Sequence, residues 1–325
     1  MSDHHEDHDH RGHEHDHERQ HGHMHGMGGH VHAPTDFGRA FAIGITLNLL
    51  YVVAEAFYGI AAHSLALLAD AGHNLGDVLG LAAAWVAALL TAKRPSDRLT
   101  YGFGRTSVLA ALGNAVALLI VTGGIAWEAL RRLIEPEPVA GLTVIVVAAI
   151  GVVLNGGTAL LFLAGRKGDL NIRSAFLHMA ADALVAFGVV IAGILILKTG
   201  GLWIDPAISL VVSVVIVIGT WSLLRQAVQL SLDAVPPGID RAKVETYLRE
   251  LPGVIEVHDL HIWGLSTTES ALTVHLVVAD DVARDVLLPR VFTDMRQRFG
   301  IGHPTIQFED AALAHLCELR PEHVI

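Results

Sequence analysis

Apolar residues gather in six long runs across the first two-thirds of the chain. A helix needs about 20 apolar residues to cross the hydrocarbon core of a bilayer. All six runs reach that length, at 39–61, 65–91, 107–131, 141–164, 171–197 and 203–224. No signal-peptide pattern precedes the first run, which starts too late and is too long for one. The pattern predicts an α-helical membrane bundle of six transmembrane helices.

The pattern changes at about Asp233, where the chain becomes polar enough for a soluble domain. Helical spacing follows in "RAKVETYLREL", and strands are indicated by "VIEVHDLHIWGL" and "SALTVHLVVA", which are rich in Val, Ile and Leu. A second helix is expected in "DVLLPRVFTDMRQRFG" and a third strand in "HPTIQFED". This order predicts a small two-layer α+β domain. A sheet of this size favours dimerisation.

The N-terminus is polar and low in complexity. Twelve of the 21 histidines lie between His4 and His32, mixed with Asp, Glu and Gly. Such a segment cannot bury a core and is expected to be disordered, and histidine-rich tracts commonly bind metal. The irregular mixture argues against a purification tag. We therefore divide the chain into a His-rich tail (1–36), a membrane domain (37–232), a cytoplasmic domain (233–310) and a C-terminal tail (311–325).

Composition narrows the function further. Hydrophobic residues make up 52% of the chain and charged residues 17%, which suits a polytopic membrane protein better than a soluble one. The formal net charge of −11 argues against nucleic-acid binding. The single cysteine, Cys317, excludes an internal disulfide framework.

Basic residues predict the orientation in the membrane, because cytoplasmic loops carry an excess of them. With the N-terminus inside, the cytoplasmic loops carry Lys93, Arg94, Arg98, Arg105, Arg166, Lys167 and Arg173. The opposite side carries Arg131, Arg132 and Lys198. Seven against three predicts a multi-pass protein of the cell membrane with both termini in the cytoplasm.

Two histidine–aspartate pairs lie inside the apolar runs. His73 and Asp77 in the second run, and His178 and Asp182 in the fifth, are each four residues apart and so share a helix face. A single pair has a simpler interpretation, as a hydrogen-bonded histidine and a helix-capping aspartate. Two pairs of the same spacing offer two nitrogens and two carboxylates, the set that tetrahedral zinc takes. They predict one divalent ion held between two adjacent helices, with Asp70 off that face in a supporting or structural role.

Other polar residues in the runs have structural interpretations. Asn48, Glu55, Asn114 and Asn155 are expected to form hydrogen bonds across helices, and Glu55 has a proton path as its alternative. Asp205 and Pro206 open the sixth run, where proline suits the first turn and aspartate a helix cap.

Three histidines lie on the first two predicted strands of the soluble domain. His258 and His261 are three residues apart, so on a regular strand they face opposite sides. Only one of them can then join His275 unless the strand has a bulge. Surface histidines without a ligand role are the alternative.

Three segments, "HSLALLADAGHNLGD", "LHMAADAL" and "VHDLHIWGLSTTESALTVHL", resemble the cation diffusion facilitator family and its bacterial zinc, cobalt and cadmium efflux members. The resemblance covers about residues 37–310. It implies a homodimeric metal/proton antiporter with six membrane helices and a ferredoxin-like cytoplasmic domain. It also implies that His73, Asp77, His178 and Asp182 form the transport site, in a combination typical of zinc-preferring members.

The resemblance implies a second, regulatory metal site in the cytoplasmic domain. His258 and His275 match its histidines, and Glu309 on the third strand is the candidate carboxylate, with the role of His303 left open. Cys317 is expected either to reach a partner subunit or to have no role.

The loop after the second run matches the family only in part. Phe103 stands where some members have a metal-binding histidine, so no site is expected there although Asp97 remains. Arg105 matches a basic position that pairs, in some members, with an aspartate at the position of Asp233. Two unrelated solvated charges are the alternative.

These features predict a transporter and not an enzyme. The expected cargo is Zn²⁺, with Co²⁺ and Cd²⁺ as further candidates, moved outward from the cytosol by alternating access in exchange for protons. Zn²⁺ is also the expected regulatory ion. A membrane metal sensor or buffer and an importer are the alternatives. A metalloprotease would need an HExxH helix, and neither the six apolar runs nor the predicted soluble domain contains that motif.

Overall fold

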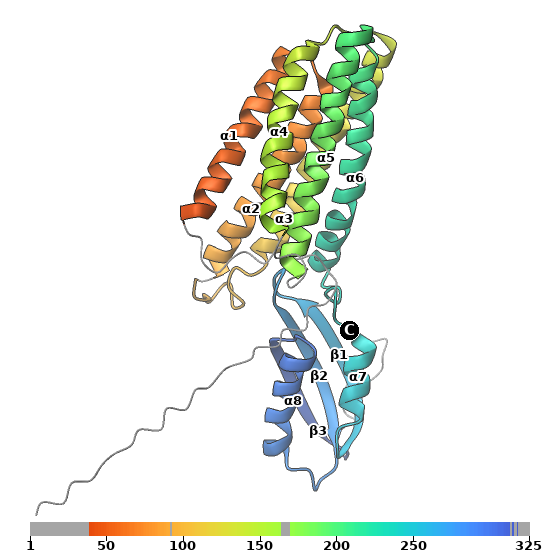
Figure 1. Ribbon diagram of the computed structural model, residues 1–325. Helices are drawn as coiled ribbons and strands as arrows, with labels where there is room; N and C mark the ends of the chain where they lie inside the picture. The colour runs from red at the N-terminus through yellow and green to blue at the C-terminus, as the bar shows by residue number, and fades with distance from the viewer. Residues whose placement is uncertain (1–38, 92, 164–169, 313, 315–316, 318–325) are drawn as a thin grey trace, which may run out of the picture.

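A computed structural model describes residues 39–325 except 92, 164–169, 313, 315–316 and 318–325. The His-rich tail predicted at 1–36 lies outside the described residues, as does most of the tail predicted at 311–325. Figure 1 shows a long bundle of helices with a small α+β domain at one end.

Six helices form the bundle, and they lie where the six apolar runs predict them. They are α1 (Arg39–Ala61), α2 (Leu65–Thr91), α3 (Thr106–Ile134), α4 (Gly141–Phe162), α5 (Leu170–Thr199) and α6 (Ile204–Ser231). Five of them, α2 to α6, are long and apolar enough to cross a membrane. Helix α1 has 23 residues, of which Asn48–Ala61 form an apolar segment among the described side chains.

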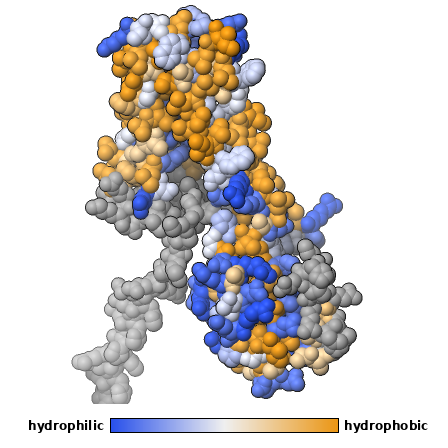
Figure 2. Space-filling view, turned by 90° about the vertical axis from the view of Figure 1, so that its right-hand side faces the viewer, coloured by the Kyte–Doolittle hydropathy of each residue, from blue (hydrophilic) through white to orange (hydrophobic). Residues whose placement is uncertain are grey.

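The outer surface of the bundle is apolar. Figure 2 shows it as a broad hydrophobic face, whereas the small domain below carries hydrophilic patches. Large apolar side chains are exposed along every helix, among them Phe57, Leu89, Ile120, Val153, Leu184 and Ile218. An apolar surface of this extent indicates contact with lipid. The protein is therefore a multi-pass membrane protein.

The helices of the bundle do not pack on one another equally. The most extensive contacts join α4 to α5 and α3 to α6, whereas α2 and α5 meet only narrowly. Helix α2 contacts all five other helices of the bundle. The second and fifth predicted helices are therefore neighbours.

Asp205 caps a helix, but not its own. The α6 cap residue makes no side-chain capping bond, and the Asp205 carboxylate instead accepts hydrogen bonds from Leu65 N (2.7 Å), Ala66 N (3.4 Å) and Ser64 Oγ at the start of α2. Free N–H groups at a helix N-terminus favour a carboxylate. The sequence predicted that Asp205 caps its own helix, α6. The backbone N–H groups that donate to its carboxylate instead belong to α2, about 140 residues earlier in the chain.

The small domain has the predicted element order. It contains α7 (Arg241–Arg249), β1 (Val254–Gly264), β2 (Ser270–Val278), α8 (Arg284–Arg298) and β3 (His303–Asp310). The sheet order is β1-β2-β3, with β1 and β2 antiparallel and β2 and β3 parallel. Both helices share one apolar core with the sheet, through Val244, Leu248, Val291 and Met295 among others. The helices therefore cover one face of the sheet.

The other face of the sheet carries the polar side chains. Val274 and Leu276 are in the core, so His275 between them points to the opposite face. A register shift in β1 separates His258 from His261, and Asp259 between them has a positive φ of 51°. This bulge leaves His258 directly opposite His275 in the β1–β2 pairing.

The two domains meet at the loop before α3. Arg105 and Asp233 form an ion pair. Close by, Thr267 N donates to Ser107 Oγ over 3.1 Å. An ideal Cβ at Gly104 would lie 2.9 Å from the Leu265 carbonyl oxygen, so glycine is needed for this close approach.

Candidate metal centres

The structure brings the two histidine–aspartate pairs together at the contact between α2 and α5. His73 Nε2 lies 3.2 Å from Asp182 Oδ1 and 3.7 Å from Asp77 Oδ2. His178 Nε2 lies 3.4 Å from Asp77 Oδ2 and 3.7 Å from Asp182 Oδ2. Each histidine thus contacts the aspartate of its own helix and that of the other.

These distances suit a single tetrahedral ion. Ligand atoms about 2.0–2.1 Å from zinc, at tetrahedral angles, are about 3.3–3.4 Å apart. The four contacts measured here run from 3.2 to 3.7 Å and use both oxygens of Asp182, so the site has to contract slightly to place one atom of each residue around an ion. His73, Asp77 and Asp182 meet as a group, each offering one ligand atom within 4.8 Å of the others, whereas His178 lies outside this group.

The site is buried on one side and open on the other. The Asp182 side chain is 4% exposed, whereas that of His178 is 45% exposed. His73 Nδ1 is buried and has no hydrogen-bond partner among the described residues. A bound cation would offset the cost of placing two carboxylates in the bundle.

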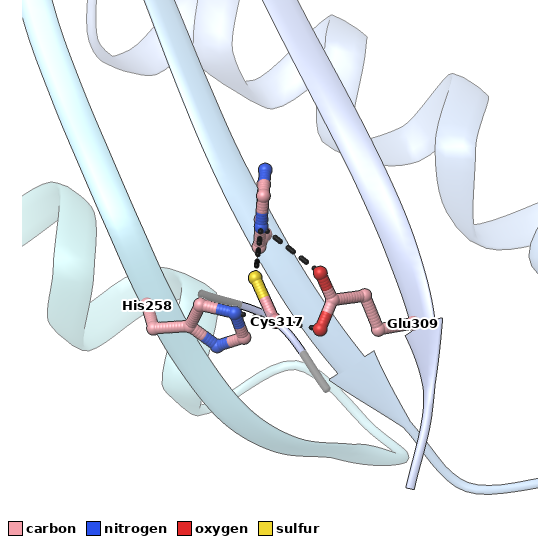
Figure 3. A group of neighbouring side chains, drawn as sticks. His258, Glu309 and Cys317 are labelled. Atoms are coloured by element: carbon pink, nitrogen blue, oxygen red, sulfur yellow. Dashed lines mark hydrogen bonds and ion pairs between the residues drawn. The ribbon is translucent and has the colours of Figure 1, made fainter. Parts of the chain in front are cut away.

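A second cluster lies on the open face of the sheet, where β1, β2 and β3 each contribute a side chain (Figure 3). His275 Nδ1 lies 3.0 Å from Glu309 Oε1, and His258 Nε2 lies 3.4 Å from Glu309 Oε2. The two imidazole rings are 5.2 Å apart, centroid to centroid. Cys317 Sγ completes the cluster, 3.5 Å from His275 Nδ1.

The second cluster contains buried polar atoms with unmet bonding capacity. Both ring nitrogens of His258, which is 7% exposed, and Glu309 Oε2 have no hydrogen-bond partner among the described residues. Buried polar atoms are rarely left so, and each costs about 1–3 kcal/mol. Two nitrogens, a carboxylate and a thiolate are zinc ligands. The residues present therefore fit a bound metal ion.

The remaining predicted residues lie outside this cluster. His261 is exposed and contacts Asp259, over 2.8 Å. His303 stacks edge-on against Tyr101, 5.6 Å between ring centroids. In the membrane domain, Asn114 Nδ2 donates to the Gly76 carbonyl oxygen over 2.9 Å, a bond across helices as expected.

Comparison with known proteins identifies the family. A model of the cation efflux transmembrane domain matches residues 41–230, and a model of the cation efflux protein cytoplasmic domain matches residues 236–311. The chain belongs to the cation diffusion facilitator family. The resemblance found in the sequence is thereby confirmed.

Individual relatives match most of this cation diffusion facilitator. The metal cation efflux system protein CzcD of Cupriavidus metallidurans is 37% identical over 284 residues, 86% of this chain and 90% of the relative. Zinc transporter ZitB of Escherichia coli is 35% identical, over 86% of this chain and 90% of the relative. The cadmium, cobalt and zinc/H(+)-K(+) antiporter of Bacillus subtilis is 32% identical, over 90% and 97%.

A solved structure, the metal-bound C-terminal domain of the CzcD transporter, is 42% identical to the part it matches. It covers 22% of this chain and 99% of its own, with a TM-score of 0.21.

Sequence reasoning missed two features of this family member. Cys317 lies beside His275 of its own chain, which the sequence does not signal because a tail has no periodicity to place it. Asp70 contacts Glu55 of α1, and only the relative rotation of two helices decides that contact.

Proposed function

We propose that this protein exports divalent metal ions from the cytosol in exchange for protons, with Zn²⁺ as the principal cargo and Co²⁺ and Cd²⁺ as further cargo. The observation that supports it most is the meeting of two imidazoles and two carboxylates at the narrow contact of α2 and α5. Relatives named for metal efflux and for zinc transport support the same cargo class.

The proposed exchange follows from the acid–base chemistry of the ligands. Metal binding requires neutral histidines and ionised aspartates, so a bound ion displaces protons and protons displace the ion. Alternating access lets cytosolic metal bind on one side and lets protons compete for the ligands on the other. An inward proton gradient then drives the ion outward. A half-exposed His178 suits an ion that has to leave.

The proposed architecture is a homodimer with six spans per chain. Helix α1 is the sixth span, and both termini lie in the cytoplasm. The small domain is ferredoxin-like. Its described elements follow the order αββαβ, which is the ferredoxin-like order βαββαβ without the first strand. A dimer-forming cytoplasmic domain is consistent with the family. The domain boundaries predicted at 36, 232 and 310 and metal capture by the tail stay predictions.

We further propose that His258, His275 and Glu309 hold a regulatory zinc ion, with Cys317 as a fourth ligand. A thiolate is a soft ligand and favours Zn²⁺ and Cd²⁺ over harder cations. The ion would supply charge and cross-links between the three strands and the tail. This site lies in the small domain, far along the chain from the transport ligands, so its loss is expected to spare them.

Metal uptake into inside-out membrane vesicles tests the export proposal. With an imposed gradient, acid inside, an exporter accumulates Zn²⁺ in the vesicle lumen. Asp182→Asn should abolish uptake because it removes the most buried ligand, whereas Asp97→Asn in the exposed loop should leave it unchanged. A sensor or buffer would show binding without uptake, and an importer would empty loaded vesicles. Either of these results would overturn the proposal.

A further inference from the structure

Two carboxyl groups lie buried together beside the membrane metal site but outside it. Glu55 of α1 and Asp70 of α2 are both fully buried, at 0% exposure. Their side chains contact each other across the α1–α2 interface. Asp70 precedes His73 by three residues, and no ion pair joins these two side chains among the described residues. The pair is thus a neighbour of the metal ligands and not one of them.

Hydrogen bonding differs sharply between the two carboxyl groups. Glu55 accepts one bond from Tyr51 Oη, over 2.9 Å, and one from Asn74 Nδ2, over 3.1 Å. Neither oxygen of Asp70 has a donor among the described residues. Ionised carboxylates only accept hydrogen bonds, so the contact between Asp70 and Glu55 is attractive only if one of them carries a proton. The geometry therefore requires a proton in the pair.

The surrounding charges do not remove that requirement. The titratable groups that face the pair are Tyr51 on α1, His73 on α2 and Asp182 on α5. Tyr51 already donates to Glu55, and His73 Nε2 is 3.2 Å from Asp182. Helix α4 contains no titratable residue, and its Val147 carbonyl oxygen lies 3.5 Å from the Tyr51 hydroxyl. Two carboxylates in such a setting share one proton because they cannot both ionise.

We propose that Glu55 and Asp70 form a proton-binding site that holds one shared proton in the metal-free protein and releases it when a divalent ion binds nearby. On release one O–H bond breaks, the proton passes to water, and the charge of the pair changes from −1 to −2. The two positive charges of the ion, placed at the neighbouring ligands, favour this second ionisation. The inference rests on the proposed transport site and adds a proton to those that the ligands exchange.

Calorimetry on the full-length protein in detergent tests this directly. Zinc is titrated in buffers of different ionisation enthalpy, which gives the number of protons released per zinc ion bound. Asp70→Asn should still bind zinc but release about one proton fewer per protein chain at zinc saturation, because an amide holds no ionisable proton. Asp205→Asn is the matched control: it removes an equally buried carboxylate, 1% exposed, that already has three donors, and should leave the count unchanged.

Infrared difference spectra with and without zinc provide a second readout. The wild type should lose the carbonyl-stretch band of a protonated carboxylic acid on binding zinc, and so should Asp205→Asn, whereas Asp70→Asn should not. If Asp70→Asn fails to fold, Glu55→Gln carries the same expectation. Equal proton counts in the wild type and the folded variant, or a band loss that persists in it, overturn the inference.

A further variant separates this inference from the proposed function. His178→Ala removes a transport ligand and leaves the carboxyl pair intact. If it binds zinc and releases protons as the wild type does, the transport site is wrong. If it loses zinc at the membrane site, keeping that at the sheet cluster, while Asp70→Asn releases the wild-type number of protons, only the proton-binding pair is wrong.

Discussion

Gly151 of α4 lies where a single methyl group should disturb the support of Glu55. An ideal Cβ at this position would be 2.3 Å from Tyr51 Oη and 3.1 Å from Tyr51 Cζ. Gly151→Ala therefore has to push the Tyr51 hydroxyl by about 1 Å to reach ordinary contact, near 3.4 Å. The displaced hydroxyl can no longer hold its 2.9 Å bond to Glu55.

The expected cost has three parts. Overpacking a tight site costs about 1–3 kcal/mol. A hydrogen bond to a charged group contributes about 1.5–3 kcal/mol. Replacing a helical glycine by alanine stabilises the helix by about 1 kcal/mol, which opposes these two costs. The free energy of unfolding should thus fall by about 1.5–5 kcal/mol, which corresponds to at least a tenfold change in the unfolding equilibrium constant.

Reversible unfolding of the purified protein in detergent measures this change. Gly157→Ala in the same helix is the control, because no atom lies within 4 Å of its ideal Cβ, and it should unfold like the wild type or be slightly more stable. Tyr51→Phe removes the clashing hydroxyl, so Tyr51→Phe/Gly151→Ala should lose little beyond Tyr51→Phe alone. The reasoning is refuted if Gly151→Ala behaves like Gly157→Ala, or if the costs of the two single changes simply add.

Three other outcomes follow from the small domain and its junction. Cys317→Ser should weaken zinc binding at the sheet cluster by about 10–100-fold or more in equilibrium dialysis, whereas His303→Ala should not. The half-exposed Arg105–Asp233 pair should show a coupling energy of only about 0–1 kcal/mol in a double-mutant cycle, and a value well above that would contradict its exposure. Burial raises the pKa of Tyr247 to about 12, so its contribution to stability is present below the usual pKa and is lost as pH rises through about 12. Absorption titration of tyrosinate should lose its highest-pH component in Tyr247→Phe, and an unchanged curve would refute the shift.

The lengths of the apolar runs predicted the membrane helices, because run length depends only on local sequence. The six apolar runs lie at the observed helices, with ends that differ most in α6, which continues to Ser231. The His-x-x-x-Asp spacing likewise placed His73 with Asp77 and His178 with Asp182, since four residues make about one helical turn. The meeting of the two pairs depends on how α2 and α5 pack. The only local sign of it was that the same His-x-x-x-Asp spacing occurs in both helices.

Contacts between distant segments could not be predicted in the same way. The carboxylate of Asp205 caps α2 because α6 happens to bring it to three free donors, and no local pattern records that neighbour. The bulge at Asp259 decides which histidine faces His275, and a non-glycine residue with positive φ is a poor sequence signal for a bulge. Cys317 was interpreted as incidental or as reaching a partner for the same reason.

The limited contact between α2 and α5 bears on how the ion is released. The ligands lie on either side of a narrow contact, with two of them on a helix that packs extensively against α4 and two on a helix held to α3 and, by Asp205, to α6. Moving α5 together with α4 away from α2 would separate the two contacts between helices, His73–Asp182 and His178–Asp77, at the same time. Coordination by four residues would then be lost in one motion.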